Sequence, residues 1–482
     1  MGAKEESMVK AIEKFFKVKE RGSKISIELL AGCVTFLAMS YILPVNAGIL
    51  GAMGMSEAGV FASTALVSGL ITIFMGLFAN VPISLSAGMG LNAFLTYTVS
   101  ITLGYNWQEC MVLLTITGIL FFILSVTPLR LIIINAIPKD IQHIISAGLG
   151  AFIAFVGLKG SGIIIGSAST LVTLGNLGNA EVWLALIGIF FTLFLMSVKT
   201  KHPMINRMAI PLGLLFTAII GVSLYYIGNA AGTAYFAELP YFHGNWGLSG
   251  LSDVIFFGAL SNEANIDHDI GGLFVSVFAN PQTYAVIFAL IFVNLFDTTA
   301  TLLSVGEDAG LLDEGGRFIN NRPVIVDAAG ALICGPLGTS TVTSFAESTV
   351  GVRVGGRTGL TSLMSGLLFI VAAFVFPVFS AFTSATVTAP ALVAVGCLIF
   401  TSNFKGLDWS DMAISFSAFV TVLLIVLTYS LTTGIGFGLL TFAIMMIASG
   451  RGKKISWPLY IVTVLFIASF AINTYFTFYA KK

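Results

Sequence analysis

Three polar residues of this 482-residue chain lie within or at the start of apolar runs, where their chemistry suits a buried site. Asp297 lies near the middle of one run, Glu347 begins a short one, and Asn92 belongs to the motif GMGLNAF. A carboxylate at mid-membrane costs about 2.5–3.5 kcal/mol on insertion scales, so its presence indicates a function. The alternatives are a protonated acid bonded within a helix interface and, for Asn92, an interhelical hydrogen bond.

Weaker candidates lie beside these three. Gly88 and Gly90 allow close approach either of a substrate to the backbone or of one helix to another. Thr301, one turn after Asp297, lines the same cavity or bonds its own backbone. Phe345 is suited to stacking on a flat ring, yet it is one of 41 phenylalanines, most of which must face lipid or core.

Composition predicts a multi-span membrane protein. The chain is 57% hydrophobic and 10% charged, with a mean hydropathy of +0.97, whereas soluble domains carry about 25% charged residues. Apolar runs of about 20 residues, enough to cross a bilayer core of about 30 Å, recur from Ile25 to Tyr479. The formal net charge is zero, which argues against a nucleic-acid partner. No P-loop motif for ATP hydrolysis is present.

Neither a metal nor another cofactor is expected. The four cysteines lie far apart and form no metal-ligand spacing or disulfide framework. One acidic cluster of a long loop resembles a metal site, but a solvated loop is the simpler interpretation; it comprises Glu263, Asp267, His268 and Asp269.

Fourteen segments are predicted, seven in each half of the chain. Those of the first half are 27–50, 60–79, 91–103, 112–126, 141–157, 182–198 and 208–227. Those of the second half are 284–305, 323–337, 345–354, 360–379, 385–401, 412–430 and 435–449. The third and tenth are too short to cross a membrane alone. The run 459–480 is a further span or an interfacial helix.

The positions of basic residues predict the orientation. With the N-terminus in the cytoplasm, the basic residues between segments fall on that side except Lys159, and no Lys or Arg occurs from Met208 to Gly316, which contains the long outer loop. The residues expected in cytoplasmic connections are Arg130, Lys139, Lys199, Lys201, Arg207, Arg317, Arg322, Arg353, Arg357, Lys405, Arg451, Lys453 and Lys454.

The two halves are expected to insert with opposite orientation, because each has an odd number of segments. Both short segments follow a proline-containing or hydroxyl-rich stretch, 80–87 and 335–346. Interrupted segments at corresponding places in inverted halves indicate the substrate site of a transporter. We expect two short strands that pair, each followed by a half-helix, because non-helical backbone at membrane depth must be satisfied within protein or a cavity.

These features divide the chain into five parts. Residues 1–24 form a cytoplasmic amphipathic segment, and 25–228 form the first repeat. An extracellular loop follows at 229–283, then the inverted second repeat at 284–450, and last a basic linker and apolar segment at 451–482.

Three blocks, GMGLNAF, NLFDTTATL with GRFINNRPVIVDAAG, and GTSTVTSFAESTVGVRVGGRTGL, resemble the purine-permease (AzgA-like) branch of the xanthine/uracil permease superfamily. The resemblance spans about Ile25 to Ser449. It implies an all-α polytopic membrane protein of fourteen segments in two inverted repeats of seven, with segments 1–4 and 8–11 as a core and 5–7 and 12–14 as a gate. It also implies that the chain is not an enzyme.

Carried onto this chain, the resemblance places substrate contacts at Asn92, Asp297, Phe345, Ala346 and Glu347. The chemistry agrees, because a purine is flat, neutral and rimmed with donors and acceptors that carboxylates, amides and helix N-termini can bind. Either acid could carry the transported proton. The residue after Glu347 is Ser348 rather than the asparagine of uracil and xanthine carriers, and Thr301 stands where uracil carriers have histidine.

We therefore predict a proton-coupled importer of hypoxanthine, guanine or adenine in the plasma membrane. Its expected partners are a purine nucleobase, protons, the lipid bilayer and, as one option, a second copy in a homodimer. Two rivals are an anion transporter of the sulfate-permease type, which the two acids disfavour, and an intramembrane acid hydrolase using Asp297 and Glu347.

Overall fold

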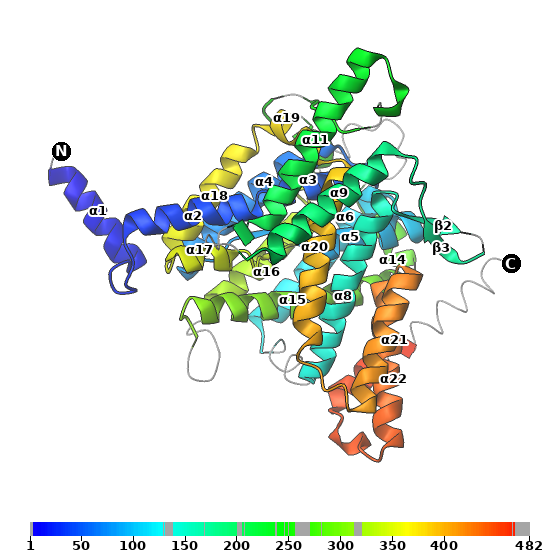
Figure 1. Cartoon of the computed structure of the whole chain (residues 1–482). Helices are drawn as coiled ribbons and strands as arrows, with labels where there is room; N and C mark the ends of the chain where they lie inside the picture. Colours follow the sequence, from blue (N-terminus) through cyan, green and yellow to red (C-terminus); the bar gives the residue numbers. More distant parts are fainter. Residues whose placement is uncertain are drawn as a thin grey trace.

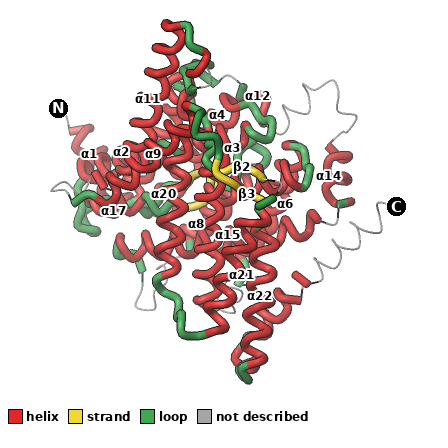
Figure 2. Tube along the Cα trace, turned by 45° about the vertical axis from the view of Figure 1, so that its right-hand side comes forward, coloured by secondary structure: helices red, strands yellow, loops and turns green. Residues whose placement is uncertain are grey.

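Long apolar sequences form helices in the computed structural model of the chain, joined by a few short strands (Figures 1 and 2). The structure describes residues 3–128, 130, 138–167, 169–199, 205–206, 208–236, 239–244, 246–248, 250–255, 270–280, 282–312, 321–464 and 466–467. The acidic loop cluster at 263–269 and most of the run 459–480 lie outside the described residues.

The first half contains helices over its predicted apolar segments and, in addition, a strand hairpin that the sequence did not predict. In chain order its elements are α1 (Ala3–Phe16), α2 (Ile25–Met39), α3 (Ile42–Gly51), α4 (Glu57–Phe74), the π-helix η1 (Met75–Ala79), β1 (Leu85–Ala87), α5 (Met89–Ala93), the π-helix η2 (Phe94–Thr102), α6 (Trp107–Val126), α8 (Lys139–Gly160), β2 (Ile164–Ser167), β3 (Leu171–Leu174), α9 (Ala180–Ser197) and α11 (Ala209–Ala231). Strands β2 and β3 form an antiparallel hairpin between α8 and α9.

The segment that connects the halves, and the second half itself, are also mainly helical. The elements are η3 (Ala234–Phe236), α12 (Leu251–Val254), α14 (Ile270–Ala279), α15 (Gln282–Asp308), α16 (Arg322–Cys334), β4 (Val342–Ser344), α17 (Ser348–Val354), α18 (Gly359–Ala372), α19 (Phe376–Phe379), η4 (Ser380–Phe382), α20 (Ala385–Phe404), α21 (Met412–Thr428), α22 (Leu431–Ala448) and η5 (Gly452–Lys454).

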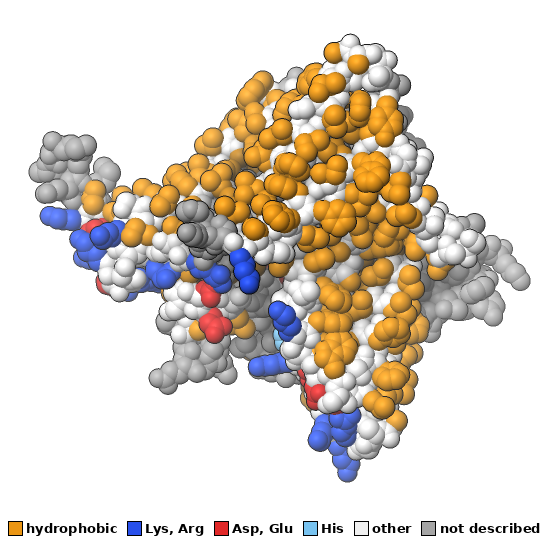
Figure 3. Space-filling view, viewed as in Figure 1, with side chains coloured by type: hydrophobic (Ala, Val, Ile, Leu, Met, Phe, Trp, Pro, Cys, Tyr) orange, Lys and Arg blue, Asp and Glu red, His pale blue; other side chains and the backbone are white. Residues whose placement is uncertain are grey.

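By length and hydropathy, nine helical stretches in the described part of the chain can cross a membrane. The number is ten if α18 and the α19–η4 stretch, bent by 94° from each other, count as one span. The short elements α16, α17 and α5 do not pass this test, so the count of fourteen crossings remains a prediction. The side chains support a membrane environment: the face in Figure 3 is mainly hydrophobic, with Lys and Arg gathered along one edge.

Helix packing repeats between the halves. Helix α4 packs against α18 as α6 packs against α16, so the second and eleventh predicted segments pair in the way that the fourth and ninth do. In the same way, α9 contacts α11 and α20, while α21 contacts α22 and α8. Adding seven to a segment number of the first half, or subtracting seven from one of the second half, turns each pair into its counterpart. Segments 2 and 11 become 9 and 4, and segments 6 and 7 become 13 and 14. This pattern is that of two related halves with interleaved segments, and it separates a core from a gate.

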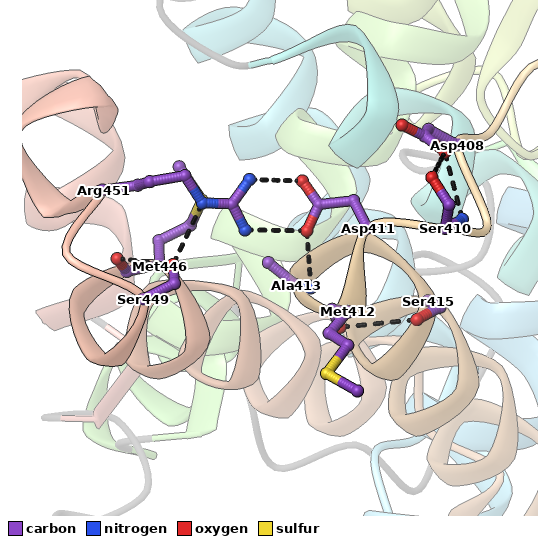
Figure 4. Close-up of polar contacts among 9 residues, drawn as sticks. All are labelled: Asp408, Ser410, Asp411, Met412, Ala413, Ser415, Met446, Ser449 and Arg451. Carbon is purple, nitrogen blue, oxygen red and sulfur yellow. Dashed lines mark hydrogen bonds and ion pairs between the residues drawn. The ribbon is translucent and has the colours of Figure 1, made fainter.

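Polar contacts stabilise the end of the molecule that we predict to be cytoplasmic. We call this end the inner end. Arg21 Nη1 donates to the backbone carbonyls of Asn80 (2.5 Å) and Arg357 (3.0 Å), which joins the segment after α1 to the core. In the gate, Arg451 donates two hydrogen bonds of 2.6 and 2.8 Å to the carboxylate of Asp411 (Figure 4). The outer end is the opposite one.

Candidate functional site

Strands β1 and β4 meet antiparallel at the centre of the core. Leu85 lies opposite Ser344, and Ala87 lies opposite Val342. Two backbone bonds extend the ladder: Gly88 N donates to Thr341 O at 2.9 Å, and Phe345 N donates to Ser84 O at 3.0 Å. The prediction that one strand from each half would pair is confirmed. The ladder satisfies one edge of each strand, which leaves the outward backbone groups to be satisfied by side chains.

A helix of each half satisfies those outward groups. On α4, the hydroxyl of Thr72 accepts from Leu85 N at 2.9 Å and donates to Leu85 O at 3.2 Å. On α16, Asp327 accepts from Ser344 N at 2.8 Å and from Ser344 Oγ at 2.7 Å. A third bond reaches Asp327 from Thr298 Oγ1 on α15, at 2.9 Å. Asp327 is fully buried, so it supports β4 and does not face a ligand.

The residues after β4 bring the second predicted acid to a partly exposed position. Phe345 is 7% exposed, whereas Ala346 is exposed and Glu347 is half-buried. Tyr41, at the break between α2 and α3, donates a hydrogen bond of 2.6 Å to Glu347 Oε1. This bond holds the carboxylate at the start of α17 while leaving part of it accessible to a ligand.

Asp297 lies on α15, which packs against α17. Its side chain is half-buried, and among the described residues none donates a hydrogen bond to it. Along its face of α15, residues 301, 304 and 308 are progressively open towards the inner end. The same face is buried in the outer direction, at Thr283, Val286, Leu290 and Asn294. Along this face of α15, the exposed positions therefore lie between Asp297 and the inner end.

Asn92 is placed in a buried polar cluster. Its Nδ2 donates to Asn46 Oδ1 at 2.8 Å. Asn46 in turn donates to Thr64 and Thr339, at 2.8 and 3.2 Å, and accepts from Ser340 at 3.1 Å. The Oδ1 of Asn92 is buried and has no hydrogen-bond partner among the described residues. This oxygen is the acceptor that the cluster leaves available.

The other candidates take different places. Gly90 is buried against the gate, since a Cβ there would lie 2.4 Å from Leu149 Cδ1 of α8. Gly88 lies at the strand ladder, where a Cβ would lie 3.2 Å from Thr343 Oγ1. Thr301 is half-buried on the Asp297 face of α15. Close packing at Gly90 thus brings the core against the gate beside Asn92.

Arg130, which the charge pattern assigned to a cytoplasmic connection, is a buried basic residue. It is 4% exposed, donates to Thr299 Oγ1 at 3.0 Å, and lies within Coulombic range of Asp327. Its Nη1 has no partner among the described residues. Sequence reasoning also missed Asp327 and Tyr41. Asp327 was detectable as a charged residue inside an apolar helix, and Pro44 marks the helix break beside Tyr41.

No group of three His, Cys, Asp or Glu side chains able to hold a metal occurs in the part of the chain that the structure describes. The described cysteines are free thiols, in agreement with their spacing. The site's donors and acceptors are thus carboxylates, amides, hydroxyls and backbone groups.

A strand-paired core packed against a helical gate defines a membrane transporter of the core–gate class. Residues 26–437 match the family model described as "Permease family", that of the xanthine/uracil permeases. The chain belongs to the xanthine/uracil permease family, as the resemblance predicted.

Relatives match over nearly the whole chain. The adenine permease AdeQ of Escherichia coli is 34% identical, with 94% of this chain and 95% of the relative covered. The guanine/hypoxanthine permease PbuG of Bacillus subtilis is 35% identical, with 95% and 98% covered. These relatives are permeases, and the chain is a multi-pass membrane transporter rather than an enzyme.

Solved structures share the fold. The transmembrane domain of the cyanobacterial bicarbonate transporter BicA has a TM-score of 0.59 at 15% identity, covering 84% of this chain and 97% of that domain. The murine Solute Carrier 26 member A9 anion transporter in the inward-facing state has a TM-score of 0.60 at 13% identity, covering 89% and 69%. At these identities the likeness concerns the fold alone.

Proposed function

We propose that the chain imports purine nucleobases, hypoxanthine, guanine or adenine, together with protons across the plasma membrane. The observation that carries the proposal is the pair of half-buried carboxylates, Asp297 and Glu347, on two contacting helices beside the exposed Ala346. Relatives named as adenine and guanine/hypoxanthine permeases support the choice of purines.

The two acids are suited to different tasks. Glu347 is oriented by Tyr41 and lies next to the exposed residue Ala346, so it is placed to accept N–H bonds from a purine edge. Asp297 receives no hydrogen bond from a described residue. Carboxylates that share a low-dielectric site do not all stay ionised. We therefore assign the transported proton to Asp297 and the reading of the purine to Glu347.

The exposed positions between Asp297 and the inner end support alternating access. In the proposal the described conformation receives or releases substrate at the inner end, and movement of the core against the gate exposes the same residues at the outer end. The N-terminus lies in the cytoplasm in this scheme. A tag after Gly452 that is reached only in permeabilised cells would support this orientation, and labelling of intact cells by an impermeant probe would contradict it.

Uptake by cells that express the chain tests the substrate and the coupling. Labelled hypoxanthine, guanine and adenine should accumulate, while xanthine and uracil should not, and a protonophore should abolish accumulation. Uptake that survives the protonophore but requires sodium would overturn the choice of coupling ion. Uptake of uracil or xanthine alone would overturn the choice of substrate.

Conservative substitutions separate the roles of the two acids. Glu347→Gln should weaken purine binding by about 1.5–3 kcal/mol, the range of a hydrogen bond to a charged group, or roughly 10- to 150-fold. Asp297→Asn should keep binding and substrate exchange while losing accumulation against a gradient. Glu307→Gln, at the exposed inner end of the same helix as Asp297, is the matched control and should change neither. Wild-type accumulation by both acid variants would show that the site is wrongly placed.

The anion transporters with this fold provide the alternative function. A carbonate-like or sulfate-like ligand needs a cation or free donors at the site, yet two carboxylates face it. The buried Arg130 does not supply this charge, because only 4% of it is exposed and it bonds Thr299. Transport of labelled bicarbonate or sulfate in place of purines would reverse this choice.

A further inference from the structure

At the outer end, Tyr429 closes the contact between core and gate. The residue stands between α21 and α22, two helices of the gate, and has left-handed backbone angles (φ 56°, ψ 31°). A non-glycine residue with a bulky side chain is rare in this region, and such positions persist where the surroundings fix them. The conformation turns the backbone carbonyl of Tyr429 towards the core.

That carbonyl accepts a hydrogen bond from Thr98 Oγ1 of η2. Because η2 continues the half-helix that carries Asn92, the bond joins the substrate-binding side of the core to the gate. The bond is partly buried, and Thr98 itself is 3% exposed. Core and gate cannot separate at this end without breaking it.

The ring of Tyr429 is enclosed from both sides. Tyr97 of η2 contacts it edge-on at 5.9 Å between centroids, and Phe152 and Phe155 of α8 do so at 5.2 and 5.7 Å. The ammonium of Lys159, also on α8, lies 4.3 Å from the ring centroid. This distance is within the range of a cation–π interaction. Lys159 is the one basic residue between segments that the charge pattern assigned to the outer side.

Three buried polar atoms on this side lack partners among the described residues: Asn92 Oδ1, Thr96 Oγ1 and Tyr429 Oη. Asn92 on α5 and Thr96 on η2 are four residues apart. They therefore lie about one helical turn apart along the line from the site to the outer end. Unsatisfied buried groups are costly. A second state that opens this side would hydrate or bind these three atoms. The inner face of α15, by contrast, is already accessible.

We propose that Tyr429 is the outer gate residue of the transport path, held closed by Thr98 through its carbonyl and by Lys159 through its ring. Opening breaks the Thr98 bond, withdraws the ring from Tyr97 and admits water or substrate to Thr96 and Asn92. The inference rests on the proposed alternating access, but not on the identity of the substrate.

The test measures access from outside without any substrate. A single cysteine replaces Thr96 in a chain whose four native cysteines are changed to alanine, and intact cells are treated with a membrane-impermeant maleimide. Adding Thr98→Val should raise the labelling rate about fivefold, the factor that corresponds to one net hydrogen bond. Lys159→Gln should raise it less, and Tyr429→Ala more.

Two controls keep the outcome decisive. Thr102→Val removes a hydroxyl of the same helix that bonds only Tyr97 O, at 2.8 Å, and should leave labelling unchanged. Thr98→Ser retains the donor and should label like the parent chain. Equal labelling of the Thr98→Val, Lys159→Gln and Tyr429→Ala chains and their parent, at equal surface expression, would overturn the proposal. Because labelling needs no purine, this failure is distinct from failure of the purine-uptake experiments.

Discussion

Replacing Asp327 should loosen the strand that carries the substrate site. Its carboxylate accepts three hydrogen bonds of 2.7–2.9 Å, two from Ser344 and one from Thr298. A hydrogen bond to a charged group contributes about 1.5–3 kcal/mol and a neutral one about 0.5–1.5 kcal/mol. In Asp327→Asn the amide oxygen can still accept from Ser344, while the Thr298 hydroxyl can rotate to accept from the new amide. The change therefore costs about 1 kcal/mol per bond, or roughly 3 kcal/mol in total.

Asp327→Ala is the more severe change, because it leaves Ser344 N and Ser344 Oγ without their acceptor and leaves Thr298 Oγ1 only a long bond of 3.4 Å to Asn294 Oδ1. At about 1–3 kcal/mol each, the sum is roughly 3–9 kcal/mol. The lower part of this range is expected, since bonds that share one acceptor do not add independently. Ser344→Ala removes only one of the three bonds and keeps the backbone donor paired with Asp327.

Thermal unfolding of the detergent-solubilised protein measures these costs, with purine binding as a second readout. The midpoint should fall in the order Ser344→Ala, Asp327→Asn, Asp327→Ala, and the last variant should also lose binding. Asp308→Ala is the control, because Asp308 forms a surface ion pair of 3.4 Å with Arg353 that is worth about 0–1 kcal/mol. If Asp327→Ala melts no lower than Ser344→Ala, the carboxylate does not support β4 and the reasoning is wrong.

Three further changes test features outside the strand pair. Glu28 is fully buried and accepts three bonds of 2.6–3.2 Å, from Arg357 N and Thr358 N just before α18 and from Thr361 Oγ1 in its first turn. Glu28→Ala should therefore lower the unfolding midpoint more than Glu28→Gln; equal midpoints would contradict this role. The hydrogen bonds from Arg451 lower the pKa of Asp411 to about 2, below its ordinary value of about 3.9. The stability from this pair is thus complete above about pH 4 and is lost as pH falls through 2, so the midpoints of wild type and Asp411→Asn should converge over that interval; a constant difference would count against it. Arg130→Gln should slow uptake without changing surface expression, because the charge near Asp327 is lost while a donor to Thr299 remains; unaltered uptake would show that the charge is dispensable.

The strand pair was predictable because its sequence is unusual for its setting. A hydroxyl-rich and β-branched stretch such as 339–344 disfavours a membrane helix and suits a strand. Both halves show an interruption at corresponding places, and backbone at that depth has few ways to be satisfied. The same argument identified Asp297 and Glu347, since a charge inside an apolar run is conspicuous.

The partners of those residues were not predictable, because they depend on three-dimensional proximity. Tyr41 bonds Glu347 across 306 positions. Pro44 marks a break in the run 27–50, but it does not indicate which residue Tyr41 contacts. The burial of Arg130 was not predictable from its place in a cytoplasmic connection. Counting charges between segments predicts the side of the membrane on which a residue lies, but not how deeply its side chain is buried. The position of Asp327 within an apolar helix was evident in the sequence. Its hydrogen-bond partner was not, because the strand edge that it satisfies belongs to β4, in another segment.

The pairing of β1 with β4 also has a consequence for biosynthesis. Ala87 and Val342, which lie opposite each other, are separated by 255 positions of chain. At about 5–20 residues per second, a ribosome needs roughly 13 to 51 s to reach the second strand after completing the first. During that interval the backbone N–H and C=O groups of β1 that later bond β4 lack a partner. We therefore expect the first half to stay at the insertion machinery with these polar groups unpaired until β4 is made. The two halves thus complete one another only late in translation, and separately expressed halves should be stable only when they are made together.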